Sequence, residues 1–331
     1  MPTGDFRPTA SLDNLRLRAA LLRRVRSFFE ADGFLEVETP LLSADTVVDR
    51  HLDPIAVPLA ASPAGGDGGP AGRRVWWLQT SPEFGMKRLL AAGADAIYQV
   101  GRAFRNDERG PLHNPEFTMV EWYRVNETMA QGIQRLTRLA ELLLARGPVE
   151  KISYAQAFRD HLGLDPHRCD GRSLAEAAKA AGIEAPASLS IDDRDGWLDL
   201  LLVERVQPHL GLARPVILYD YPASQAALAC VRREDPPVAE RFELYAEGIE
   251  LANGYHELQD PAELRRRGAE NNRLRALDGK PPLPEESRLL AAMECGLPDS
   301  TGVALGWDRV VMLAAGAKCL DEVIAFPFPR A

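Results

Sequence analysis

Cysteine and long hydrophobic runs are both scarce in this sequence. No stretch approaches the roughly 18 uninterrupted apolar residues that a membrane-spanning helix needs. The first ten residues lack the basic and then apolar pattern of a secretory signal. The scattered cysteines include no Cys-x-x-Cys pair, which is typical of reduced thiols without a metal role. We therefore expect a cytoplasmic protein without a membrane segment. The four cysteines are Cys169, Cys230, Cys295 and Cys319.

Positive charge is in deficit, since the formal net charge is −9. A protein that holds a whole tRNA usually presents a basic face to the phosphates. Arginines do cluster at 23–26 and at 265–267, but both clusters fall in helical patterns and are interpreted as solvated helix faces. The charge balance favours a function without tRNA.

The two common glycine-rich nucleotide loops are missing as well. No Gly-x-Gly-x-x-Gly and no Gly-x-x-x-x-Gly-Lys-[Ser/Thr] follows a predicted strand. Periodicity instead predicts strands, a mostly helical insertion at about 128–210, and strands again. This order favours an α+β fold with an antiparallel sheet flanked by helices, and we interpret 1–331 as one domain. A Gly- and Pro-rich segment, 61–72, is interpreted as a hairpin tip. The predicted helices are Leu12–Asp32, Ser81–Ala92, Ala262–Leu277, Glu285–Cys295 and Trp307–Ala315, and the predicted strands are Phe34–Thr39, Ile55–Leu59, Val75–Thr80, Ala96–Arg105, Phe117–Val125, Val216–Tyr219, Leu228–Val231, Arg241–Ala252 and Gly302–Leu305.

Two arginines stand at positions that indicate an anion site. Arg105 ends a predicted strand before a polar loop, where its planar guanidinium can grip a phosphate or carboxylate with two hydrogen bonds. Arg309 falls in the first turn of a predicted helix, where the helix dipole disfavours a cation. Just before it, Gly302, Ala304 and Gly306 are small enough to let a ligand lie against the strand.

An acidic hairpin indicates a metal site. Glu243 and Glu250 lie in strand-like runs on either side of a predicted turn at Glu247 and Gly248. Two converging carboxylates repel each other unless a hard cation lies between them. Mg²⁺ that bridges ATP phosphates is the usual cation for such a pair.

These segments resemble motifs 2 and 3 of the class II aminoacyl-tRNA synthetases, and 31–40 with its preceding helix resembles motif 1. The finer match is to the catalytic domain of lysyl-tRNA synthetases, through Thr-Ser-Pro-Glu (80–83), His-Asn-Pro-Glu-Phe-Thr-Met (113–119) and Glu-Arg-Phe-Glu-Leu (240–244). The likeness covers Leu12 to Phe326. Those synthetases carry an anticodon-binding domain before motif 1, whereas motif 1 lies near the start of this sequence.

A synthetase reduced to its catalytic domain resembles the family of elongation factor P lysine ligases. Three segments resemble that family more closely than the synthetases: 221–229, 248–258 and 322–326. The resemblance implies ATP-dependent activation of (R)-β-lysine or lysine as an adenylate, followed by transfer to a lysine side chain of elongation factor P. Two alternatives stay open, namely a truncated lysyl-tRNA synthetase that charges tRNA and a non-catalytic paralogue.

The resemblance also implies roles for individual residues around ATP. Arg105 and Arg309 would be catalytic, because they hold the α- and γ-phosphates, and Glu243 and Glu250 would carry Mg²⁺. The family usually has Glu where this chain has Asp107, whose side chain is one methylene shorter. The implied ATP-binding set is Arg105, Asn106, Asp107, Asn114, Phe117, Glu250, Leu251, Gly306 and Arg309.

A lysine substrate has two ammonium groups and one carboxylate, so its pocket needs anions at both ends. Burial of an ammonium without an anion costs several kcal/mol. Ala304 stands where synthetases have Gly, and its methyl group is expected to tune the choice between α- and β-lysine. The implied substrate-binding set is Ser81, Pro82, Glu83, Glu121, Tyr123, Asn253, Glu257 and Ala304.

The first testable prediction is a homodimer. By resemblance, the helix and strand of motif 1 (12–40) form the dimer interface, and the apolar stripe of this helix is wide enough to pack against a second copy. Sedimentation at micromolar concentration should show a dimer. A stable monomer at that concentration would contradict this assignment.

Overall fold

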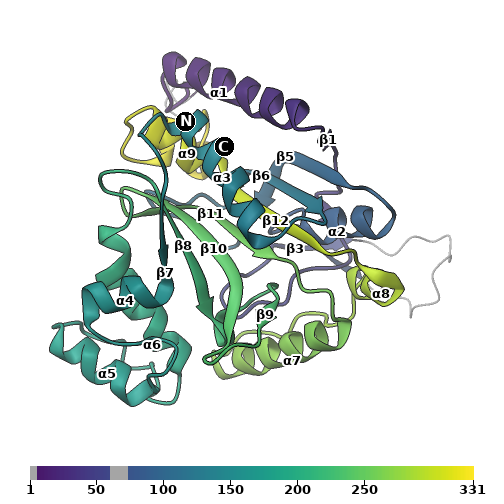
Figure 1. The fold of residues 1–331 in the computed structure, drawn as a ribbon. Coiled ribbons are helices and arrows are strands. Elements are labelled where there is room, and N and C mark those ends of the chain that lie inside the picture. Colours follow the sequence, from purple (N-terminus) through teal and green to yellow (C-terminus); the bar gives the residue numbers. More distant parts are fainter. Residues whose placement is uncertain (1–5, 60–73) are drawn as a thin grey trace. The chain divides into compact units, whose positions relative to one another are not determined.

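The computed structural model describes residues 6–59 and 74–331, so the predicted hairpin tip at 61–72 lies outside the described residues. The chain forms two compact units (Figure 1). The first unit comprises Met1–Val125, Gln259–Pro298 and Gly306–Ala331. The second unit comprises Asn126–Leu258 and Asp299–Leu305.

The first unit contains a main strand pair and a small three-stranded sheet. Strand β5 pairs with β6 in antiparallel fashion and with the short β1 in parallel. In the small sheet, β4 lies between β2 and β3, which confirms that 55–59 and 75–80 are partners. The elements of this unit are α1 (Leu12–Ala31), β1 (Leu35–Glu36), β2 (Leu42–Ser43), β3 (Ala56–Leu59), β4 (Arg74–Leu78), α2 (Glu83–Ala91), β5 (Ala96–Phe104), β6 (Glu116–Val125), α7 (Pro261–Leu277), α8 (Arg288–Gly296), α9 (Trp307–Ala314) and two 3₁₀ turns, Leu320–Glu322 and Phe328–Arg330.

Alternation along β6 gives the first unit its core face and its site face. Trp122 points to the core face, where Phe29 of α1 packs at 5.1 Å between ring centroids. Phe29 also stacks on Tyr98 of β5 at 4.6 Å. Because successive strand residues point to opposite faces, Glu121 and Tyr123 lie on the other face. The apolar stripe of α1 therefore decides which side of β6 remains for a ligand.

The second unit is built on five ordered strands, β12-β11-β10-β8-β7, with β9 paired to one end of β10. All neighbours are antiparallel except β7 and β8. Antiparallel pairing thus dominates both units, and the predicted α+β class is confirmed. The elements are α3 (Met129–Leu144), β7 (Glu150–Ser153), α4 (Tyr154–Leu162), α5 (Gly171–Ala180), α6 (Arg194–Leu201), a π-helical turn (Leu202–Val206), 3₁₀ turns Gln207–His209 and Ala223–Gln225, β8 (Val216–Pro222), β9 (Val231–Arg232), β10 (Val238–Ala246), β11 (Ile249–His256) and β12 (Ser300–Gly306).

The helical insertion contains one strand that the sequence pattern did not predict. Strand β7 pairs in parallel with β8, from Glu150 opposite Val216 to Ser153 opposite Tyr219. Its four residues, Glu-Lys-Ile-Ser, include one large apolar side chain, so no alternation is visible. The predicted strand at 228–231 is also shorter, since the only paired strand there is Val231–Arg232 and Ala229 forms an isolated bridge to Glu257.

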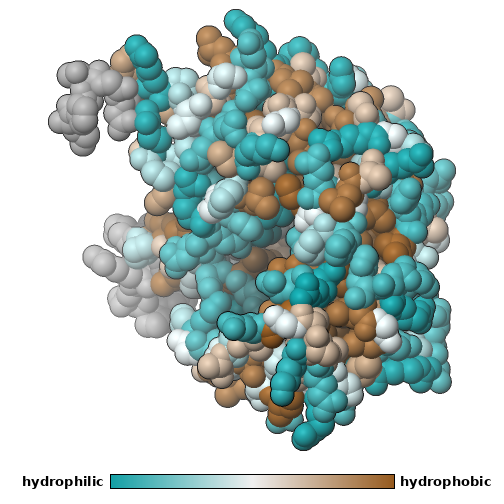
Figure 2. Space-filling view, turned by 90° about the vertical axis from the view of Figure 1, so that its left-hand side faces the viewer, coloured by the Kyte–Doolittle hydropathy of each residue, from teal (hydrophilic) through white to brown (hydrophobic). Residues whose placement is uncertain are grey.

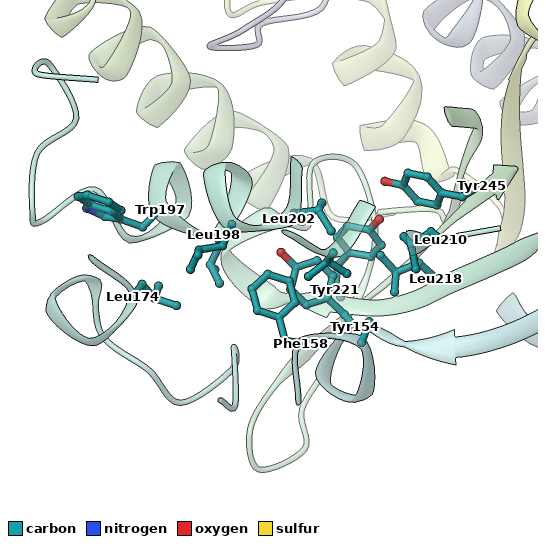
Figure 3. Close-up of a cluster of buried hydrophobic side chains, with 14 of the residues drawn as sticks. Tyr154, Phe158, Leu174, Trp197, Leu198, Leu202, Leu210, Leu218, Tyr221 and Tyr245 are labelled. Carbon is teal, nitrogen blue, oxygen red and sulfur yellow. The ribbon is translucent and has the colours of Figure 1, made fainter. Parts of the chain in front are cut away.

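Helices α4, α5 and α6 lie together beside β7 and bury a common core (Figure 1). Tyr154 and Phe158 of α4 stack at 4.6 Å, and Tyr154 contacts Tyr221 of β8 at 4.8 Å between ring centroids. Trp197 of α6 lies in the same cluster (Figure 3). This core joins the helices to the strands β8 and β10.

The tip of the β10–β11 hairpin is fixed by the segment before β8. The N–H of Gly248 donates to the carbonyl of Leu210 at 2.8 Å. Gly211 has a φ of +73°, and a Cβ there would lie 2.6 Å from the carbonyl oxygen of Tyr245. Glycine is therefore required for this close approach, and the hairpin that carries Glu250 is held at both ends.

Hydrophilic side chains cover most of the molecular face in Figure 2, with hydrophobic residues scattered among them. Such a mixed surface is ordinary for a protein surrounded by water. Among the described residues, no helix combines the length and the apolar character that crossing a membrane requires.

The second prediction concerns stability against pH. A hydrogen bond with Glu240, supported by Asp299 at 2.6 Å, raises the pKa of His256 to about 9. The folded state thus holds this proton more tightly than the unfolded chain, whose imidazole titrates near ~6.5. The resulting stabilisation is complete below pH ~6.5 and is lost as the pH rises through about 9.

The free energy of unfolding, measured with urea from pH 6 to 10, should therefore fall with rising pH in the wild type. In the His256→Gln variant this fall should be largely absent. Parallel stability curves for the two proteins would contradict the charged network.

Candidate active site

Arg105 lies at the end of the β5–β6 pair where a polar loop connects the two strands. Its N–H donates to the carbonyl of Pro115 at 2.9 Å, which closes the polar loop between the strands. Its guanidinium carbon lies 5.0 Å from the ring centroid of Phe117. Among the described residues, the buried Nε of Arg105 has no hydrogen-bond partner. The aromatic face thus orients a cation that has donor capacity left for an anion.

Arg309 is held near the same loop. Its Nε donates to the carbonyl of Leu112 at 3.1 Å, and its Nη2 lies 2.7 Å from Nε2 of His113. Burial, and then the charge of Arg309, lower the pKa of His113. A neutral imidazole can accept a hydrogen bond from the guanidinium. The charge of Arg105 also lowers the pKa of His113. Both arginines therefore lie near this imidazole, where they can bind one polyphosphate together.

A buried aspartate sets the start of α9. The side chain of Asp308 accepts from the N–H of Thr118 at 2.7 Å and pairs with Arg18 of α1 at 2.5 Å. Asp308 is 2 % exposed. It therefore ties α9, which carries Arg309, to β6 and α1. Our sequence analysis did not identify this role, although a carboxylate at the start of a largely apolar helix is a visible signal.

The loop residues predicted to face ATP are at present engaged with their own chain. The Nδ2 of Asn106 donates to Asp107 at 2.8 Å, and Asp107 has a φ of +59°. The buried side chain of Asn114 donates to the carbonyl of Glu116 at 2.6 Å and accepts from the N–H of Phe328 at 3.0 Å. Asn114 thus joins the loop to the C-terminal segment, and the contacts of these residues with ATP stay predictions.

Five of the predicted substrate residues lie together in the first unit. The hydroxyls of Ser81 and Tyr123 donate to Glu121 at 2.8 and 2.7 Å. Glu83 pairs with Lys87 one turn along α2 at 2.5 Å. Pro82 precedes the helix as its N-cap residue. Two carboxylates against one lysine leave a net negative charge, which suits an incoming ammonium group. Sequence analysis missed Lys87, although its i, i+4 spacing from Glu83 is a recognisable signal.

The second unit brings three more of the predicted residues, Glu243, Asn253 and Ala304, to one face of its strands. Directly opposed residues in an antiparallel sheet point to the same side. Glu243, Asn253 and Ala304 form one such row across β10, β11 and β12. Arg241, Tyr255 and Gly302 form the adjacent row, and Glu250 lies opposite Tyr245 beyond a bulge. Leu251 is buried at this bulge, and Gly306 ends β12 as the N-cap of α9.

Glu257 continues this face just beyond β11. It is 1 % exposed, and its N–H donates to the carbonyl of Ser300 at 2.9 Å. Its backbone forms the bridge to Ala229, and its carbonyl accepts from the thiol of Cys230 at 3.1 Å. The position of its carboxylate is therefore determined by three chain segments.

The carboxylate of Glu243 is already occupied, which does not suit the predicted role of a magnesium ligand. Its carboxylate is 3 % exposed, and one oxygen pairs with Arg241 at 2.5 Å. The other oxygen accepts from the hydroxyls of Tyr221 and Tyr245, whose pKa values burial raises well above the usual range. The two phenols are thus neutral donors, and both oxygens are already used. Within the described residues, no cluster of three or more His, Cys, Asp or Glu side chains has the arrangement of a metal site.

Comparison with known proteins agrees with this arrangement. The sequence matches the family of class II tRNA synthetases for aspartate, lysine and asparagine over residues 3–330. It is 48% identical over 329 residues to the elongation factor P–(R)-β-lysine ligase of Klebsiella pneumoniae strain 342, with 99% of each chain covered. It is 47% identical to the ligase of the same name from Salmonella arizonae, again over 99% of each chain.

The third prediction tests the carboxylate cluster in the first unit. Tyr123→Phe removes one of the hydroxyl donors to Glu121. Hydrogen bonds to charged groups contribute about 1.5–3 kcal/mol, so the KM for a lysine substrate should rise roughly tenfold or more while the KM for ATP stays unchanged.

Tyr98→Phe is the matched control, because it removes a hydroxyl–carboxylate bond of 2.8 Å to Glu36 elsewhere in the same unit. Equal effects of the two variants on the KM for lysine would refute the assignment of Glu121 and Tyr123.

Proposed function

Because the chain belongs to the class II tRNA synthetase family for aspartate, lysine and asparagine, we propose that it is an ATP-dependent ligase that activates (R)-β-lysine and transfers it to elongation factor P. The observation that carries this proposal is that Arg105 and Arg309 both lie near His113, in the same unit as the carboxylates Glu83 and Glu121. The full-length likeness to ligases of that name supports the amino acid and the acceptor.

The first chemical step joins the substrate to AMP. A carboxylate oxygen of the amino acid attacks the α-phosphorus of ATP, the bond to the bridging oxygen breaks, and pyrophosphate leaves. Arg105 stabilises the charge that develops on the α-phosphate, and Arg309 holds the γ-phosphate. Phe117 offers its ring to the adenine. Fixed donors of this kind act without reorganisation during the reaction.

The second step transfers the aminoacyl group. The neutral amine of an acceptor lysine attacks the carbonyl carbon of the adenylate, AMP leaves, and an amide bond forms with loss of the amine proton. A lysine amine becomes neutral in such a site where burial lowers the pKa of its ammonium group or where a carboxylate accepts the proton as a general base. The acidic total charge of −9 favours this protein acceptor over tRNA.

Recognition of the substrate follows from its charges. Glu83, next to Ser81 and Pro82, binds the amine near the carboxylate end of the substrate. Glu121 and Tyr123 bind the terminal ammonium group, and the family resemblance assigns Glu257 to the substrate as well. Asn253 contacts the substrate carboxylate through its amide nitrogen, which carries a second N–H besides the one that it donates to Tyr255. Ala304 forms the floor beside Asn253 and contributes to the choice of lysine isomer.

Mg²⁺ is part of the proposal as a companion of ATP. We propose that Glu250 holds the ion, whereas Glu243 could bind it only after losing its three present donors. When bound, the ion neutralises the phosphates. We further propose a cytoplasmic homodimer in which the exposed side of α1 forms the interface, because the apolar stripe of this helix already packs on β5 and β6 of its own chain.

A truncated synthetase that charges tRNA and a non-catalytic paralogue are the rival functions. The curated relatives, of almost the same length, are ligases by name, which favours the protein acceptor over tRNA. A paralogue without activity needs neither arginine in place, so the geometry around His113 favours catalysis.

The fourth prediction tests adenylate formation. Arg105→Ala and Arg309→Ala should each reduce ATP–pyrophosphate exchange with (R)-β-lysine by roughly a hundredfold or more, because loss of one charge-stabilising contact costs about 3 kcal/mol or more. Arg273→Ala, which breaks an exposed pair with Glu270, is the control and should leave exchange unchanged. Normal exchange in either active-site variant would overturn the placement of ATP, and no exchange by the wild type would overturn the proposed function.

A further inference from the structure

Residues 221–229 form a segment that resembles the ligase family in sequence but has no role in the mechanism above. The segment begins at the end of β8 and passes through the 3₁₀ turn Ala223–Gln225. It then runs beside Glu257, through the Ala229 bridge and a 2.9 Å hydrogen bond from the N–H of Leu258 to the carbonyl of Leu228. Its backbone is therefore part of the wall that sets the position of Glu257.

Arg241 fastens this segment to β10. Its Nη1 donates to the carbonyl of Gln225 at 2.8 Å. Its guanidinium carbon lies 4.6 Å from the ring centroid of Tyr221, the first residue of the segment. A planar guanidinium can donate in one direction and stack in another at the same time, which an ammonium group cannot do. Arg241 thus holds both the start and the turn of the segment.

Arg241 also lies close to the support of Asn253, the residue predicted to contact the substrate carboxylate. It is directly opposite Tyr255, whose ring centroid is 6.0 Å from the guanidinium carbon. The hydroxyl of Tyr255 accepts from Nδ2 of Asn253 at 2.9 Å. This bond fixes which way the amide of Asn253 points, and leaves its Oδ1 and its other N–H for different partners. Arg241 therefore touches the supports of both Asn253 and Glu257.

Glu243 is the counter-ion that keeps Arg241 in place. Its Oε1 pairs with Nη2 of Arg241 at 2.5 Å. The hydroxyls of Tyr221 and Tyr245 donate hydrogen bonds to its other oxygen, and both tyrosines belong to the hydrophobic core cluster in Figure 3. Removal of one partner from a buried pair leaves an uncompensated charge. A carboxylate with this surrounding is a structural anchor, and a metal ion would have to displace three donors to reach it.

We infer that Arg241 is a positioning residue for the lysyl substrate, acting through the segment 221–229, and that Glu243 is its counter-ion instead of a magnesium ligand. The inference rests on the proposed function, because it assigns Asn253 and Glu257 to the substrate. It separates the two glutamates of the hairpin, since Glu250 serves the metal and Glu243 serves Arg241.

The test compares Arg241→Lys, Arg241→Met, Glu243→Gln and Glu250→Gln with the wild type. Arg135→Met is the matched control, because Arg135 forms a similar buried pair with Glu127 in the same unit at 2.7 Å. The measurements are the KM values for (R)-β-lysine and ATP in pyrophosphate exchange, kcat, and the shift in melting temperature on addition of ATP as Mg²⁺ is titrated.

The Arg241 variants and Glu243→Gln should raise the KM for (R)-β-lysine about tenfold to a hundredfold, because small displacements of positioned groups have effects of this size. Their KM for ATP and their Mg²⁺ midpoint in the melting experiment should match the wild type. Glu250→Gln should shift that midpoint to higher Mg²⁺, and Arg135→Met should lower the melting temperature alone. If Arg241→Met does not fold, Arg241→Lys carries the test, since it keeps the charge and loses the planar fork.

A Mg²⁺ midpoint raised by Glu243→Gln as much as by Glu250→Gln would show that Glu243 is a metal ligand and would overturn the inference. Arg241 variants that behave like Arg135→Met, with normal KM for the lysine substrate, would also overturn it by showing a purely structural role. A wild-type enzyme that activates no lysine isomer overturns the proposed function and the inference together, and is recognised before any variant is compared.

Discussion

The burial of carboxylates beside fixed donors is the constraint on which both units depend. A buried carboxylate keeps its charge only where hydrogen bonds and a cation replace water. Asp308 meets this requirement through Arg18 and Thr118, and so fixes the helix that carries Arg309. Glu121 accepts hydrogen bonds from the hydroxyls of Ser81 and Tyr123. Each of these buried carboxylates is thus held in one orientation by partners from its own unit.

The same requirement applies to one face of the second unit. Glu243 is compensated by Arg241 and joins the strands to the helical core. Its neighbour Asn253 has a side-chain oxygen that no described group satisfies, and the small Ala304 lies opposite Asn253 on β12. One row of residues thus contains both a compensated charge and an unsatisfied polar atom. A lysine substrate, with charges at both ends, is the kind of molecule that such a surface can orient.

Much of the architecture could be predicted from sequence because it depends on local signals. Helix α1 has a continuous apolar stripe, and the turn at Glu247 and Gly248 separates two clear strand patterns. Strand β7 could not be predicted, since four residues with one apolar side chain acquire their structure from the distant β8. The hydrogen bonds to Glu243 could not be predicted from the sequence either, because Tyr221 donates from another strand, β8. The resemblance of the motifs supplied candidate site residues. The three-dimensional structure was needed to see that Glu243 already pairs with Arg241 and is hydrogen-bonded by two tyrosines.

The central claim is that an amine of elongation factor P, and not tRNA, receives the activated lysyl group. The most direct measurement incubates the enzyme with ATP, labelled (R)-β-lysine and either purified elongation factor P or total tRNA, and then locates the label by mass spectrometry and acid precipitation. The account predicts one added lysyl group in amide linkage on a lysine of elongation factor P, with little or no label on tRNA. Efficient labelling of tRNA without labelling of the protein would contradict it and would establish the truncated synthetase instead.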